Sequence, residues 1–87
     1  MGKFEAIIVP SFQKELDKIR DRKQLELIIK ATSKIERIGK NSIKILHLRG
    51  RFILGEIKFM NPPYRLYVIA DQTNEKFYIV RWEHKEV

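Results

Sequence analysis

The hydrophobic residues of this 87-residue chain change their spacing once, near Asn41, and that change restricts the fold more than any other feature. Before Asn41, apolar residues recur every three or four positions, as on one side of an amphipathic helix. After it they alternate within short runs separated by Gly50, by Asn-Pro-Pro and by Asp-Gln-Thr-Asn-Glu, which is typical of strands. Because short connections favour antiparallel neighbours, the second half of the chain predicts an antiparallel sheet.

The first half of the chain predicts one strand and two helices. The opening run KFEAIIVP is rich in β-branched residues and ends at Pro10, which cannot continue a strand ladder. Ser11 is the expected N-cap of a first helix, and Asp21 with Gln24 resembles the capping box of a second. Gly39 stands where a glycine commonly ends a helix. Because the connection near Asp21 is tight, the two helices are expected to form an antiparallel hairpin.

These elements predict an α+β fold with a single domain over residues 1–87. The N-terminal strand and the helical hairpin are expected to pack on one face of a four- to five-stranded, mainly antiparallel sheet. In the predicted strand pair from Glu56 to Ile69, alternate side chains face the helices and the others face the helix-free side. The helix-facing set comprises Ile57, Phe59, Leu66, Val68 and Ala70, and the opposite set comprises Glu56, Lys58, Met60, Arg65, Tyr67, Ile69 and Asp71.

Lys58 and Arg65 are the strongest candidates for a functional site. If residues 60–63 form a four-residue loop, Lys58 lies directly across from Arg65, and opposed like charges destabilise a strand pair. Either solvent screens the two charges or an anion binds between them. A phosphate in that position would accept charge-assisted hydrogen bonds from both side chains, and the guanidinium is able to form two of them.

The formal net charge of +7 is concentrated in the middle of the chain. Between Lys40 and Arg65 there are six basic residues, and Glu56 is the single acidic one. A polyanion-binding surface requires such clustering, although a basic surface also serves solubility alone. An aromatic side chain on the same sheet face would stack on a base, as in many RNA-binding sheets. The candidate RNA-binding residues are therefore Lys44, Arg49, Arg51, Tyr67 and Arg81.

His84 and Lys85 are further candidates because they follow the last predicted strand. A histidine near basic side chains transfers protons close to neutral pH, although a lone histidine near a chain end is commonly just exposed. Strand parity decides which of the two residues faces the basic surface, and a single bulge would reverse the answer. The same ambiguity applies to Arg81.

Several kinds of site are absent from the sequence. Without cysteine there is neither a disulfide nor a thiolate zinc site, and two histidines are too few for a metal site, so no metal or cofactor is expected. No apolar run approaches the roughly 20 residues of a membrane-spanning helix, so we expect a cytoplasmic protein without membrane contact. An enzyme with these residues would use Lys, Arg, His or Tyr, which suits RNA cleavage by the 2′-hydroxyl group of the RNA itself.

Nearly the whole chain resembles the RelE/ParE superfamily of bacterial and archaeal toxins. The opening strand, SFQKELDKI as a first helix, a longer second helix and the ending YRLYVIADQTNEKFYIVRWEHKEV occur in the order found in that family. YRLYVIAD is similar to the family's Tyr-Arg-hydrophobic-Tyr strand with its acidic turn, and HKEV is similar to its His-Arg-x-x-Val-Tyr ending. The resemblance implies a RelE-like fold.

For a RelE-like member, the resemblance implies the toxin of a type II toxin–antitoxin system. Such a toxin is an mRNA interferase, an endoribonuclease that cuts messenger RNA on the ribosome without metal and so inhibits translation and arrests growth. A cognate RelB-like antitoxin silences it in a hetero-oligomer. By position, Lys58 resembles the family's second active-site lysine, Arg65 its phosphate-binding arginine and Lys85 its C-terminal arginine. Together with His84, these are the expected catalytic residues.

Three positions depart from the family pattern. Glu56 stands in place of the first active-site lysine, Lys85 replaces an arginine, and the terminal tyrosine is missing after Val87. His84 or Tyr67 is a candidate to replace the lost aromatic acid or base. These departures leave two other interpretations open. One is a ParE-like protein that inhibits DNA gyrase by binding, and the other is a catalytically degenerate toxin fold that binds only antitoxin or RNA.

Overall fold

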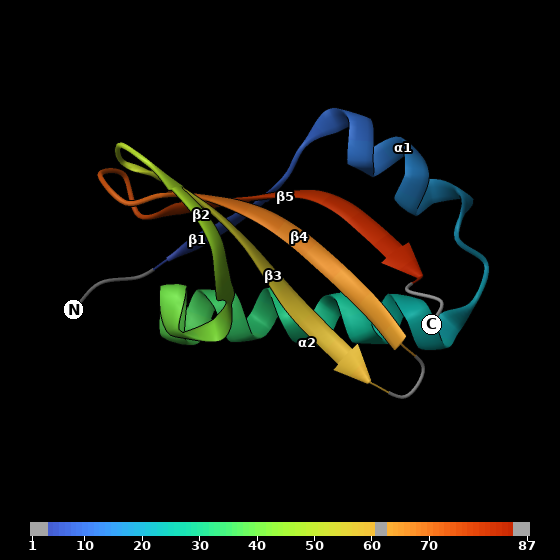
Figure 1. The fold of residues 1–87 in the computed structure, drawn as a ribbon. Helices are drawn as coiled ribbons and strands as arrows, with labels where there is room; N and C mark the ends of the chain where they lie inside the picture. The colour runs from blue at the N-terminus through green and yellow to red at the C-terminus, as the bar shows by residue number, and fades with distance from the viewer. Residues whose placement is uncertain (1–3, 61–62, 85–87) are drawn as a thin grey trace.

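Two α-helices and a five-stranded mixed sheet make up the computed structural model of the chain, which describes residues 4–60 and 63–84 (Figure 1). The elements are, in chain order, β1 (Glu5–Ile8), α1 (Pro10–Lys18), α2 (Arg22–Ile38), the 3-10 helix η1 (Gly39–Ser42), β2 (Lys44–Arg49), β3 (Phe52–Met60), β4 (Pro63–Asp71) and β5 (Lys76–His84). The strand order is β1-β5-β4-β3-β2, with β1 parallel to β5 and the other neighbours antiparallel. The predicted α+β class is confirmed.

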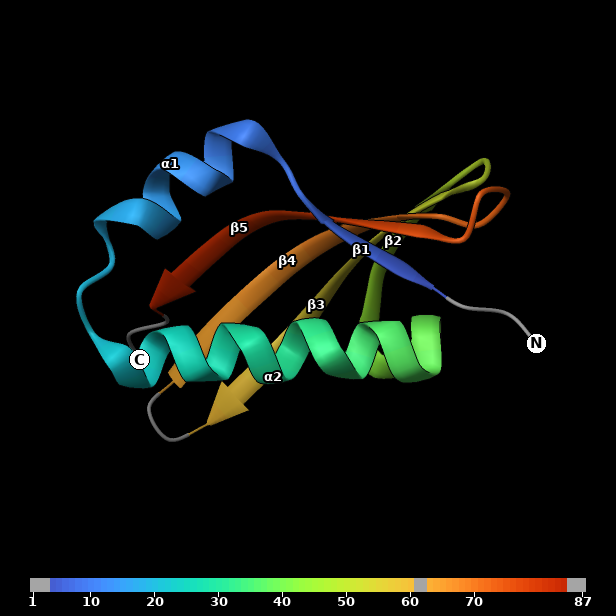
Figure 2. The same ribbon diagram turned by 180° about the vertical axis from the view of Figure 1, so that it is seen from behind.

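The hydrophobic core lies between the sheet and the helices. Helix α2 runs along one face of the sheet, and α1 packs beside the second half of β5 (Figures 1 and 2). Phe12 of α1 and Ile35 of α2 are fully buried against the sheet, and burying each such side chain contributes roughly 1.5–3 kcal/mol. The predicted helix-facing set is confirmed, because Phe59 packs against the core and the other members are buried. Those other members are Ile57, Leu66, Val68 and Ala70.

The structure confirms Asp21 and Gly39 at the two ends of α2 but not the N-cap predicted for α1. Pro10 is the first residue of α1, preceded by Val9, so the N-cap predicted at Ser11 is wrong. A proline suits the first helical position because its missing N–H would have no helical partner there. Asp21 is the N-cap of α2, with its Oδ1 accepting from the Lys23 backbone N–H at 2.9 Å. Gly39 ends α2 with a φ of 59°, a left-handed conformation that favours glycine.

Gln24 links α2 to the last strand instead of completing a capping box. Its Nε2 donates to Asp21 Oδ2 at 3.4 Å, whereas a capping box would have it accept from the Asp21 backbone N–H. Its Oε1 accepts from Trp82 Nε1 at 2.9 Å. Gln24 therefore holds the start of α2 against the helix-facing side of β5.

The strand pair β3–β4 has the predicted register. Lys58 lies opposite Arg65, and Met60 lies opposite Pro63, while residues 61–62 between them fall outside the described residues. The other members of the predicted helix-free set share that second face, but two of their carboxylates are unexpectedly buried. Glu56 is 8% exposed and Asp71 is 3% exposed.

Asp71 has a structural role at the β4–β5 turn. Asn74 Nδ2 donates to its Oδ2 at 2.8 Å, and its Oδ1 accepts from the backbone N–H groups of Thr73 and Asn74. The hydrogen bond from the Asn74 side chain is the main reason that the pKa of Asp71 lies below its usual 3.8, although burial opposes this shift. Asp71 therefore stabilises the turn as a carboxylate.

A bulge at Val80 sets the orientation of the second half of β5. The register with β4 passes from Val68 opposite Ile79 to Tyr67 opposite Arg81, so Val80 is the extra residue. Without it, Arg81 would share the helix-facing side with Ile79, because side chains alternate along a strand. The bulge instead turns Arg81 to the face without helices.

Candidate anion-binding site on the open sheet face

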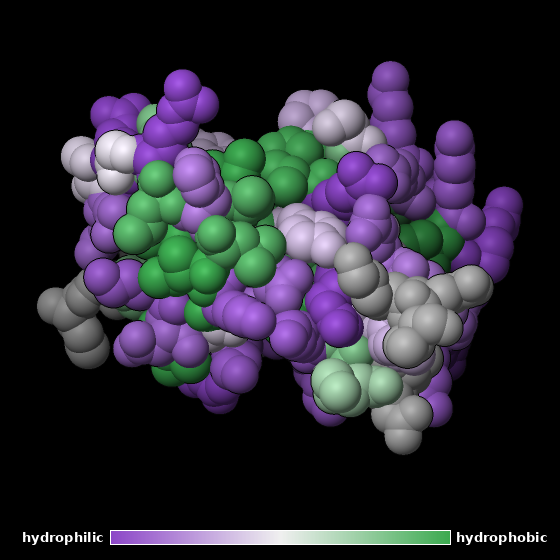
Figure 3. All heavy atoms as spheres, viewed as in Figure 1, coloured by the Kyte–Doolittle hydropathy of each residue, from purple (hydrophilic) through white to green (hydrophobic). Residues whose placement is uncertain are grey.

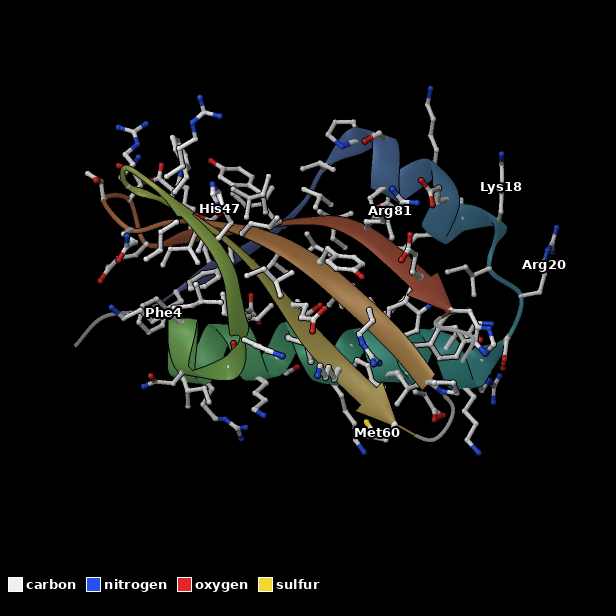
Figure 4. All side chains as sticks on the ribbon, viewed as in Figure 1. Phe4, Lys18, Arg20, His47, Met60 and Arg81 are labelled. Atoms are coloured by element: carbon white, nitrogen blue, oxygen red, sulfur yellow. The ribbon has the colours of Figure 1, made fainter. Side chains whose placement is uncertain are left out.

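The face of the sheet opposite α2, which we call the open face, is divided into an apolar and a charged half. Figure 3 shows apolar side chains gathered over β2 and the adjoining part of the sheet. Phe52 and Leu54 belong to this half and are 41% and 38% exposed. The charged half extends toward the tip of β3, where Met60 lies (Figure 4). The sequence predicted a mixed, basic face but not this division.

Two rows of side chains cross the charged half. In the first row, Lys58 of β3 faces Arg65 of β4, which in turn faces Glu83 of β5. The second row has one residue from each of β2, β3, β4 and β5, namely Lys44, Glu56, Tyr67 and Arg81. Carboxylates therefore stand next to the opposed cations and offset part of their repulsion.

Arg65 is oriented by the backbone of its own strand pair. The side chain is half-buried, and its Nη1 donates to the carbonyl oxygen of Tyr64 at 3.1 Å and to that of Phe59 at 3.4 Å. These bonds use one corner of the guanidinium fork and leave its other N–H groups for a ligand. Arg65 is thus held in one orientation on the open face.

Lys58 lies beside the side chain of Lys44, which comes from the next strand. Contact with the Lys44 ammonium, followed by repulsion between the two charges, lowers the pKa of Lys58 below its usual 10.5. Partial burial and the charge of Arg65 lower it further, whereas Glu56 raises it. A lowered pKa makes more of the neutral amine available near neutral pH, so Lys58 is better suited to accept a proton than an isolated lysine.

Replacing Lys44 with methionine is expected to raise the pKa of Lys58 toward 10.5, because the largest cause of its depression disappears. The measurement is an NMR titration of the Lys58 side chain in both proteins. Lys40→Met is the matched control, since Lys40 is also exposed but belongs to η1. An unchanged Lys58 titration in Lys44→Met would contradict the contact described above.

Two of the predicted RNA-binding arginines are already paired with carboxylates. Arg51 Nε lies 3.5 Å from Asp71 Oδ1, and the Arg51 guanidinium also lies 4.9 Å from the ring centre of Phe52. Arg81 Nη2 lies 2.7 Å from Glu83 Oε2. Both arginines stay more than half exposed, so neither is withdrawn from solvent.

The structure does not bring every predicted RNA-binding residue to the same place. Arg49 lies opposite Phe52 at the turn end of β2, and Arg51 lies in that turn. Lys58 is nearly a strand length away, about 20 Å for an extended segment. Lys44 and Tyr67, by contrast, lie beside the Lys58–Arg65 pair, and the Tyr67 hydroxyl donates to Glu83 Oε1 at 3.5 Å.

His84 lies away from the cationic cluster. It is opposite Tyr64, on the helix-facing side with Trp82, and its ring centre is 5.0 Å from that of Tyr64. The bulge at Val80 causes this placement, as the parity argument anticipated. The catalytic assignment of His84 therefore lacks the geometry it needs, whereas Lys85 lies outside the described residues.

The sequence placed the carboxylate of Glu56 on this face but did not identify that of Glu83. Glu56, which departs from the family pattern, lies between Lys44 and Tyr67 across three strands. Glu83 approaches both Arg81 and Tyr67. Its position depends on the bulge, and no glycine or proline in that strand marks a bulge in the sequence.

The fold and this site define an α+β protein with an open, partly cationic sheet face suited to binding an anion. Comparisons of the chain with protein-family models, with curated proteins and with solved structures find no match. No helix in the described part of the chain combines the length and the apolar character needed to cross a membrane.

Proposed function

We propose that this protein is a RelE-like toxin of a type II toxin–antitoxin system that cleaves messenger RNA on the ribosome. The observation that carries the proposal is the convergence of Lys44, Lys58 and Arg65 from three neighbouring strands on the open face. Three cations from separate strands suit the phosphate backbone of RNA. In this proposal a RelB-like antitoxin binds the toxin in the cytoplasm and keeps it inactive.

The proposed reaction uses the RNA's own 2′-hydroxyl group as the nucleophile. Arg65 binds the scissile phosphate and stabilises the charge that develops on it. Lys58 accepts the 2′-hydroxyl proton, for which its lowered pKa is favourable. The 2′ oxygen bonds to phosphorus as the bond to the 5′ oxygen breaks, giving a 2′,3′-cyclic phosphate. Tyr67, turning from Glu83, gives its proton to the leaving 5′ oxygen.

Primer extension on cellular messages after induction of the protein tests this function. We expect new 5′ ends at codon-phased positions in translated messages and none in untranslated RNA. DNA-damage signalling without RNA cuts would instead support a ParE-like inhibitor of DNA gyrase. Growth arrest without either signal would contradict both activities.

A second candidate function is a toxin fold that binds antitoxin or RNA without catalysis. The alternation of carboxylates with cations favours it, because Glu56 and Glu83 offset part of the positive charge that phosphate binding needs. RNA binding without cleavage in a translating extract would distinguish this candidate from the interferase.

A further inference from the structure

A groove of about 510 Å³ lies at the edge of the sheet, between α2 and the second half of β3. Its floor is apolar, since Ala31 and Ile57 are buried there and Phe59 is half-buried. Ile29 of α2 borders the groove and is 64% exposed, although it is a large apolar side chain. The groove therefore offers apolar surface that is accessible from solvent.

The backbone beside this groove has an unpaired edge. Strand β2 pairs with β3 only as far as Glu56, which faces Lys44. Within the described residues, the segment 57–60 therefore has a strand neighbour on the β4 side alone. Figure 1 shows this end of β3 extending past β2. An unpaired strand edge presents a row of N–H and C=O groups to which another extended segment can bind.

Cations border the groove, three of them on α2 and one on β3. Lys30, Lys34 and Arg37 are spaced so that they lie on one side of α2, and Lys58 contributes from β3. The residues that line the groove include no carboxylate. Its charge therefore favours an acidic occupant and disfavours a second copy of this chain, which carries a net charge of +7.

We propose that this groove binds an extended, acidic segment of a partner protein, in which carboxylates alternate with apolar side chains. The segment pairs with residues 57–60 of β3 as an added strand. Its apolar side chains face α2 and cover Ile29, Ile57 and Phe59, while its carboxylates alternate to the other face of the sheet, where Lys58 lies. The cations of α2 attract the negative charge of the segment as a whole. RNA would satisfy the cations but would leave the apolar floor and the strand edge without partners. The inference does not depend on RNA cleavage by the open face.

The first test uses the wild-type protein and a short, capped, fluorescent peptide in which glutamate alternates with isoleucine or valine. We expect binding by fluorescence anisotropy, with NMR shift changes in the amides of residues 57–60. Two N-methylated peptides are compared, each with methyl groups on the amides of one edge. Methylation of the edge that pairs with β3 is expected to abolish binding, whereas methylation of the opposite edge is expected to preserve it. Absence of binding, or equal binding by a scrambled peptide, would overturn the proposal.

The second test reverses two exposed charges on α2. Lys34→Glu combined with Arg37→Glu is expected to weaken peptide binding by about tenfold, since two attractive interactions become repulsive. Lys18→Glu is the control and should bind as wild type, because Lys18 projects from α1 on the far side of the molecule (Figure 4). Circular dichroism verifies that each variant is folded.

A third test uses RNA as the competing class of ligand. If a single-stranded oligouridylate shifts the same amides and loses affinity through the same two charge reversals, the groove binds nucleic acid and the peptide proposal is wrong. Because the peptide assay contains no RNA, its outcome is separate from that of the cleavage assay.

Discussion

Arg65→Ala is expected to reduce the rate of messenger RNA cleavage by at least about 100-fold. A loss of this size is typical when an enzyme loses a hydrogen-bond donor that stabilises the charge of the transition state. Its guanidinium lies on the open face opposite Lys58 and is held by the carbonyl oxygens of Phe59 and Tyr64. Alanine removes both the charge and the fork that would bind phosphate. The measurement is the rate of cleavage in a reconstituted translation reaction with a defined message.

Two further variants separate catalysis from folding. Arg65→Lys retains the charge but not the fork, so cleavage should be intermediate. Arg20→Ala removes an exposed arginine near the end of α1 and should leave the rate unchanged (Figure 4). Loss of the two carbonyl contacts is expected to cost Arg65→Ala only about 1–2 kcal/mol of folding free energy. Wild-type cleavage by folded Arg65→Ala would refute the proposed mechanism.

Phe12→Ala is expected to lower the free energy of unfolding by about 3–5 kcal/mol. Phe12 is the one α1 side chain that is fully buried, and it belongs to the core shared with α2 and the sheet. Removing its ring leaves a cavity and weakens the attachment of α1. Because small domains are stable by only about 5–15 kcal/mol, this loss is a large share of the total. Urea denaturation followed by circular dichroism measures it.

Ile29→Ala is the matched control for this prediction. Ile29 is a large apolar residue on α2 that is 64% exposed, so its truncation should change the free energy of unfolding by less than about 0.5 kcal/mol. If the two variants lost similar amounts of unfolding free energy, burial would not distinguish the two positions. That result would contradict the core described above.

The local patterns that predicted this fold are those that depend on near neighbours in the chain. Apolar spacing located the helices, and Gly39 and Asp21 marked the termini of α2. A loop assumed over residues 60–63 predicted the register of β3 and β4, and the structure has Lys58 opposite Arg65 in that register. Pro10 was interpreted as the end of a strand, although it also begins α1.

Features that depend on distant neighbours were not predictable in this way. Nothing in the run from Glu5 to Ile8 indicates that its partner is β5, because the pairing joins segments far apart in the chain. The bulge at Val80 lies in a continuous apolar run without glycine or proline, and it decides the faces of Arg81 and His84. The sequence therefore predicted the Lys58–Arg65 pair of the candidate site, but not the faces on which Arg81 and His84 lie.

The parallel pairing of β1 with β5 has a consequence for biosynthesis. Strand β1 is synthesised before its partner β5, and both α-helices and three strands are made in between. Until β5 emerges, β1 lacks its strand partner and the apolar side chains of Phe77 and Ile79 are missing from the interior. A nascent chain is thus expected to complete its sheet only after β5 has been made, and until then part of the apolar core stays exposed to solvent.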